Sequence, residues 1–105
     1  MAYDLHIGLK RSSHKYRMSI NESVHDLLFE SIKRESFSVP YFNRLSDYYS
    51  DAKFVDHDLL KLEIELHFLS KFFKENYKIS TVLNDMNVLI EEAKRTKMCI
   101  FGICD

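Results

Sequence analysis

The chain has 105 residues, 46% of them apolar and 30% charged, and its formal charge is −1 at pH 7. This length supports one hydrophobic core, so we expect a single domain over residues 1–105. The near-neutral charge argues against a dedicated nucleic-acid binder, and two glycines are too few for a glycine-rich phosphate loop. No apolar run reaches the length of about 20 residues that a membrane span needs.

The first residues and the cysteines indicate the cellular compartment. The segment from Met1 to Ile7 has neither the basic start nor the long apolar stretch of a signal peptide. Two cysteines without such a signal are typical of a reducing environment, in which thiols stay free. We therefore expect a cytoplasmic protein.

Two alternating segments at the start of the chain predict a β-hairpin. In residues 3–9 every second side chain is apolar, and in residues 15–20 the apolar positions are Tyr16, Met18 and Ile20. This period of two is that of a half-buried strand. The polar connection between the two segments is too short for a parallel crossover, so the strands are expected to pair antiparallel.

A helical period follows and predicts the first two helices. The first begins after Asn21, a suitable N-cap, and one of its faces carries, at helical spacing, Val24, Leu27, Leu28, Ser31 and Ile32. The second is expected to begin near Pro40, because proline costs nothing in the first turn of a helix. Its shared face consists of Tyr41, Leu45, Tyr48 and Tyr49.

The third helix, expected over residues 56–74, is apolar around most of its circumference. One stripe consists of Leu59, Leu62, Leu66, Leu69 and Phe73, and a second stripe beside it of Ile64, Phe68 and Phe72. A helix of this kind is packed on several sides, so we expect it at the centre of the fold. The fourth helix is expected over residues 80–96, with a clean apolar stripe of Val82, Leu83, Met86, Leu89, Ile90 and Ala93.

The chain ends in an apolar run from Met98 to Cys104, whose length favours a strand buried on both faces. We expect this strand to join the hairpin through residues 3–9. The element order is then β-β-α-α-α-α-β. It defines an α+β fold in which a small antiparallel sheet is packed with four helices.

Candidate catalytic and metal-ligating residues are sparse. Glu63 and His67 can share one helix face, but a stable metal site needs three or four ligands, and exposed polar pairs at this spacing are common. Cys99 and Cys104 have an odd spacing, so on one strand they point to opposite faces. We expect no catalytic residue, no metal and no cofactor. A small hydrolase or metal-dependent enzyme that uses His67 and Glu63 is kept as a third alternative.

The connection between the first two strands is basic, and its cationic or imidazole side chains are Lys10, Arg11, His14, Lys15 and Arg17. Such a loop can bind phosphate, although basic hairpin tips are usually only solvated. Phosphate binding is therefore kept as an alternative to a solvated surface.

Carboxylates and tyrosines are concentrated in the middle of the chain, over residues 44–65. An exposed tyrosine ring supplies contact area at low entropic cost, and a neighbouring carboxylate pairs with arginine or lysine of a partner. The expected partner-binding residues are Asp47, Tyr48, Tyr49, Asp51, Asp56 and Asp58. The alternative is that the aspartates only end one helix and cap the next, with the tyrosines in the core.

These features resemble the small bacterial immunity proteins of contact-dependent growth inhibition. The resemblance rests on the compact start Met1–Ile7, on the Tyr/Asp-rich middle Tyr41–Tyr49 and on the lack of a catalytic signature. It implies a cytoplasmic protein that binds a cognate toxin domain, often a nuclease, and blocks its active site, with no nucleic acid or membrane as partner. The alternative is a structural or regulatory homo-oligomer, a homodimer joined through the C-terminal strand.

Overall fold

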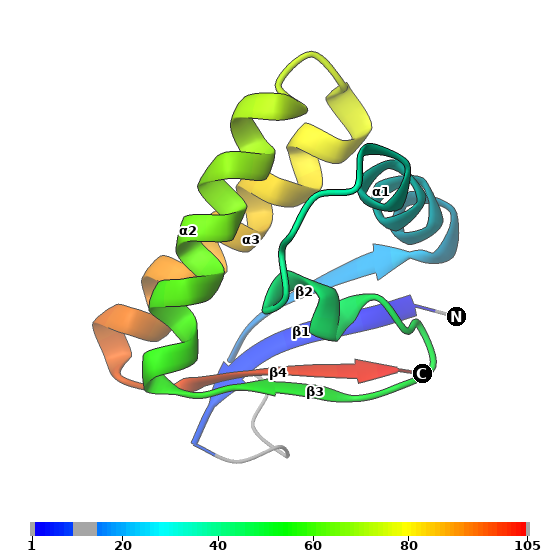
Figure 1. The fold of residues 1–105 in the computed structure, drawn as a ribbon. Coiled ribbons are helices and arrows are strands. Elements are labelled where there is room, and N and C mark those ends of the chain that lie inside the picture. The colour runs from blue at the N-terminus through cyan, green and yellow to red at the C-terminus, as the bar shows by residue number, and fades with distance from the viewer. Residues whose placement is uncertain (1, 10–14, 105) are drawn as a thin grey trace.

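A computed structural model of the chain describes residues 2–9 and 15–104, which form a four-stranded antiparallel sheet, three α-helices and one 3-10 turn (Figure 1). The elements in chain order are β1 (Ala2–Gly8), β2 (Lys15–Asn21), α1 (Glu22–Glu35), the 3-10 turn η1 (Phe42–Leu45), β3 (Ala52–Phe54), α2 (Asp56–Phe72), α3 (Tyr77–Thr96) and β4 (Cys99–Cys104). The α+β class is confirmed. The predicted count of four helices is wrong, and one strand was not predicted.

The sheet has the strand order β2-β1-β4-β3. The predicted hairpin of β1 and β2 is confirmed, and so is the pairing of the C-terminal strand with β1, which runs from Tyr3 opposite Cys104 to Gly8 opposite Cys99. On its other side β4 pairs with β3 through Ile100, Phe101 and Gly102. β4 therefore lies inside the sheet, so the open edge that a homodimer joined through this strand would use is already paired with β3. The homodimer itself stays a prediction.

The pattern in residues 40–49 predicts a helix, and this prediction is wrong. The segment makes the single turn η1, and its buried side chains recur every three residues, at Phe42, Leu45 and Tyr48. The Asp47 carboxylate then accepts a hydrogen bond from the Tyr49 N–H, with 2.9 Å between N and Oδ1. This local bond replaces a helical one, because short polar side chains compete with the helix for backbone groups. The strand β3 that follows is too short to show an alternating pattern.

The helix starts follow from capping side chains. The Asn21 side chain accepts a hydrogen bond from the Val24 N–H and so caps α1 as predicted. Asn76 does the same for Ile79, which starts α3 at Tyr77, three residues before the predicted start at Ser80.

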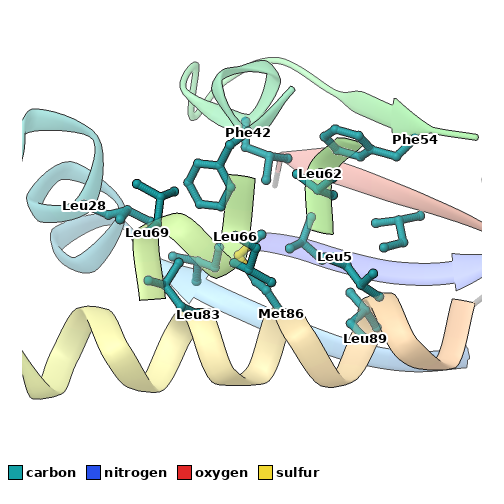
Figure 2. Packing of buried hydrophobic residues seen from close by; sticks show 14 of the residues in the cluster. Leu5, Leu28, Phe42, Phe54, Leu62, Leu66, Leu69, Leu83, Met86 and Leu89 are labelled. Atoms are coloured by element: carbon teal, nitrogen blue, oxygen red, sulfur yellow. The ribbon is translucent and has the colours of Figure 1, made fainter. Parts of the chain in front are cut away.

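All three described helices lie on one side of the sheet (Figure 1). The core between them combines Leu5 of β1, Phe42 of η1 and Phe54 of β3 with apolar side chains of the helices (Figure 2). Helix α2 contributes Leu59, Leu62, Leu66 and Leu69, and α3 contributes Ile79, Leu83, Met86, Leu89, Ile90 and Ala93.

Helix α2 buries only one of its two apolar stripes. The stripe of Ile64, Phe68 and Phe72 is exposed, so the prediction that this helix is packed on several sides is wrong. The physical reason is topology. The elements with the most contacts to α2 are α3, β3 and η1, and they cover the side that faces the sheet. On the outward side Phe37 contacts Phe68 and Phe72, and both rings stay about half exposed.

The strand face turned away from the helices carries polar groups that are also buried. Asp4 accepts hydrogen bonds from Arg17 at 2.7 Å and from Ser19 at 2.5 Å. His6 stacks on Phe101, with 5.5 Å between ring centroids. These pairs link β1 to its two neighbours, β2 and β4.

Candidate protein-binding surface

The six predicted partner-binding residues do not form one patch. Asp47, Tyr49 and Asp51 are exposed together between η1 and β3, whereas Tyr48 is buried. Asp56 and Asp58 lie beyond the other end of β3, in the first turn of α2. The structure therefore leaves one compact group, which we call the acidic loop (residues 47–51).

Tyr48 belongs to the core, and its prediction as a binding residue is wrong. Its side chain is 5% exposed and packs against Tyr3 and His25, at centroid distances of 6.0 and 4.8 Å. The 3-10 turn before it directs every third side chain inward, and Tyr48 continues that series.

Asp58 caps the start of α2, in agreement with the alternative that the aspartates of this region cap a helix. Its carboxylate accepts a hydrogen bond from the Val55 N–H at 3.0 Å and pairs with Arg44 at 3.2 Å. Burial by itself raises the pKa of Asp58, but the bonds from Val55 and Arg44 outweigh it and hold the pKa below its ordinary value. Both interactions lie within the fold, and a role of Asp58 in partner binding stays a prediction. Asp56 is exposed but separate from the acidic loop.

Hydrogen bonds fix the acidic loop to the sheet at several points. The Tyr3 hydroxyl of β1 donates to the Ser50 carbonyl at 2.8 Å. The Cys104 N–H of β4 donates to the Asp51 carboxylate at 3.1 Å, and the Cys104 thiol donates to the Tyr49 carbonyl at 3.2 Å. A loop held in this way loses little conformational entropy when it binds a partner.

Gly102 makes room for this arrangement. A Cβ atom at residue 102 would lie 2.8 Å from both the hydroxyl oxygen and a ring carbon of Tyr3, closer than carbon atoms tolerate. The glycine of β4 therefore allows the Tyr3 ring to pass over β4 at residue 102, so that its hydroxyl reaches the Ser50 carbonyl.

Tyr49 is the exposed aromatic side chain of the acidic loop. Its side chain is 65% exposed, and the ring meets the buried Tyr48 ring edge to face at 5.6 Å. The Tyr49 ring thus rests against a core residue and is otherwise mostly exposed, with the exposed Asp47 and Asp51 two residues away on either side in the chain.

The loop is electrostatically negative. Hydrogen bonds from the Tyr49 N–H and the Ser50 hydroxyl lower the pKa of Asp47, so this carboxylate is ionised at neutral pH. Burial raises the pKa of Tyr3, and the charges of Asp51 and Asp47 raise it further, so its hydroxyl stays protonated as a donor.

A groove of about 500 Å³ adjoins the loop, between α1 and η1. Its lining includes Ser46, next to Asp47, and two exposed carboxylates of α1, Asp26 and Glu30, against one lysine, Lys33. The helical period of the first helix, whose apolar face holds Val24, Leu28 and Ile32, leaves Asp26, Glu30 and Lys33 on its other face. It gave no signal that this face lies beside the acidic loop, because the contact depends on how the chain folds back after α1.

The remaining candidates do not assemble into a site. Glu63 pairs with Lys94 at 3.0 Å, and no group of three or more His, Cys, Asp or Glu among residues 2–9 and 15–104 is placed to hold a metal. Cys99 and Cys104 are thiols that are not joined in a disulfide. Of the basic hairpin tip, Lys10, Arg11 and His14 lie outside the described residues, and Arg17 is paired with Asp4.

None of the helices that the structure describes has the length and hydropathy of a membrane-crossing segment. Comparison of the chain with protein-family models, with curated proteins and with solved structures found no significant match.

Proposed function

We propose that this chain is an immunity protein that binds a cognate toxin domain, such as a nuclease, and blocks its active site with the acidic loop. The observation that carries the proposal is the exposed Tyr49 ring, which shares with the exposed Asp47 and Asp51 a loop that is bonded to β1 and β4. Rigid aromatic anchors of this type dominate the energetics of many protein interfaces.

The charge of the surface supports a basic partner. A nuclease must hold a nucleic-acid backbone, so its active-site cleft is cationic. The acidic loop and the carboxylates of Asp26 and Glu30 present the opposite charge over one side of the molecule. A complementary surface speeds association and competes with the substrate for the same cleft.

The experiment takes the product of the open reading frame beside this gene as the candidate toxin domain and measures whether this protein inhibits it. Wild-type protein is expected to inhibit cleavage of nucleic acid at a one-to-one ratio. Tyr49→Ala should weaken the inhibition constant by about 30-fold, because a central aromatic anchor contributes about 2 kcal/mol.

A matched control is Tyr77→Ala, since Tyr77 is the exposed tyrosine at the start of α3, on another element. This variant is expected to inhibit like the wild type. The proposal fails if the wild type does not inhibit the toxin domain, or if the Tyr49 and Tyr77 variants inhibit equally well.

A further inference from the structure

The outward face of α2 carries a row of large apolar side chains. Leu60, Ile64, Phe68 and Phe72 are 55%, 59%, 48% and 49% exposed. They are spaced by four residues, so they form one continuous ridge about 18 Å long. We call this row the α2 ridge.

One end of the α2 ridge packs against another part of the chain. Phe37, from the segment after α1, meets the rings of Phe68 and Phe72 edge to face at 4.9 and 4.7 Å. At the opposite end Leu60 borders a hollow lined also by Lys94 and Lys97. The aromatic contacts therefore hold the Phe68 and Phe72 end of the ridge in place, and the Leu60 end is open.

The polar side chains beside the ridge are cationic or imidazole groups. Exposed neighbours on the same face of α2 are His57, Lys61, His67 and Lys71. Within the described residues, Lys61 and Lys71 form no ion pair.

The carboxylates of α2 point elsewhere. Glu63 pairs with Lys94 on the α3 side, and Glu65 accepts hydrogen bonds from the Tyr41 and Phe42 N–H groups on the η1 side. Asp56, at the first turn, is the exposed exception. Away from this end, the ridge and its borders combine apolar area with positive charge.

The shape of the ridge indicates what kind of surface fits it. A row of residues four apart packs into the groove between similar rows of another α-helix. Each step of four residues also turns by about 40° around the axis, so the ridge winds around α2 by about 120° in all. A helix that crosses α2 at an angle can place the groove between its own rows over the middle of the ridge, which a flat surface without such a groove cannot do.

A second copy of α2 is a poor occupant. In a two-fold antiparallel pair the ridges would cross midway between Ile64 and Phe68, and Lys61 of each copy would then face Lys71 of the other. Like charges placed opposite each other across an interface are repulsive. A carboxylate-bearing helix has the opposite effect, because it neutralises both lysines.

We propose that the α2 ridge is a docking site for an amphipathic helix of another protein, with apolar residues on one face and carboxylates beside them. This site shares no residue with the acidic loop. It gives the protein a second interface, of opposite charge, that does not depend on toxin binding.

The probe is a synthetic helical peptide with Leu and Ile at every third or fourth position and Glu at the flanking positions. A peptide with Lys in place of Glu is its matched control. We expect micromolar binding of the Glu peptide, at least tenfold weaker binding of the Lys peptide, and NMR shifts centred on α2.

Leu60→Ser/Ile64→Ser should weaken binding of the Glu peptide at least tenfold, since neither side chain joins the aromatic contacts of Phe37. Lys61→Glu/Lys71→Glu should reverse the preference between the two peptides. Val88→Ser, an exposed apolar position on α3, should bind like the wild type.

Three results would overturn the proposal. The first is no binding of the Glu peptide, or binding that the Leu60/Ile64 variant retains. The second is stronger partition onto phosphatidylserine vesicles than onto the peptide, which would assign the ridge to a lipid surface. The third is a dimer in light scattering that the same variant dissociates. None of these results bears on toxin inhibition, which Tyr49→Ala tests separately.

Discussion

Asp4 shows how a single polar residue can stabilise the sheet from the face away from the helices. Burial by itself raises the pKa of its carboxyl group. Hydrogen bonds from Ser19 and Arg17, and the charge of Arg17, outweigh burial and hold the pKa below its ordinary value. The folded protein therefore favours the ionised form of Asp4 more strongly than the unfolded chain does.

Replacing Asp4 by Asn removes the charge and should lower the free energy of unfolding at pH 7 by about 1–2 kcal/mol. A carboxyl group whose pKa is lower in the folded protein than in the unfolded chain stabilises the fold at pH values above its unfolded-state pKa. That stabilisation is full above about pH 5 and is lost as the pH falls through the folded-state pKa. The difference between Asp4→Asn and the wild type should therefore shrink on acidification.

Urea unfolding at pH 7 and at pH 3 measures this difference. The control is Asp85→Asn, because Asp85 is exposed on α3 and forms no hydrogen bond or ion pair within the part of the chain that the structure describes. An Asp4→Asn variant as stable as the wild type at pH 7 would contradict the role given to this carboxylate.

At the scale of elements, α2 shows that a periodic pattern can predict a helix but not which of its apolar stripes is buried. The sequence predicts the helix and its main stripe, and both are confirmed. It cannot tell which of two neighbouring apolar stripes is covered, because that depends on the number of elements that pack around the helix. Ile64 and Leu66 are both apolar and two residues apart, yet one is exposed and the other is buried.

The different burial of Leu66 and Ile64 predicts losses of stability of very different size when each is truncated to alanine. Leu66→Ala should lower the free energy of unfolding by about 2–5 kcal/mol, since it leaves a cavity in the core. Ile64→Ala removes an exposed side chain and should change it by less than about 0.5 kcal/mol. Equal losses in urea unfolding would mean that both stripes of α2 are buried.

The segment between α1 and α2 was predicted least well. Its tyrosines fit a helical face, but hydrogen bonds of Asp47 end the turn early and the chain continues into β3. Such local competition between side chain and backbone is decided by geometry that a hydrophobic pattern does not contain. The strands β1, β2 and β4 were predictable because each has six or seven residues, which is long enough to show an alternating pattern or a continuous apolar run.

At the scale of the whole molecule, the candidate surface was half predictable. Composition located the acidic and aromatic residues, and Asp47, Tyr49 and Asp51 do lie together. The sequence could not separate Tyr49 from Tyr48, since adjacent residues differ only in the direction that the turn gives them. It could not bring Asp26 and Glu30 beside the loop either, because they are some 20 residues away in the chain.

In the proposed function, the acidic loop is the site at which a basic toxin cleft is recognised. Replacing Asp47 and Asp51 by Asn removes two charges but keeps oxygen acceptors for the hydrogen bonds from Tyr49 and Cys104. The fold and the Tyr49 anchor should therefore persist, and only electrostatic attraction should weaken.

The most direct test is the association rate constant with the toxin domain, measured by stopped flow from low to high ionic strength. Asp47→Asn/Asp51→Asn should associate at least tenfold more slowly than the wild type at low salt and should show a flatter dependence on salt. Glu91→Gln, an exposed control on α3, should follow the wild type. If the double variant kept the rate and the salt dependence of the wild type, the acidic loop would not be the surface that recognises the toxin.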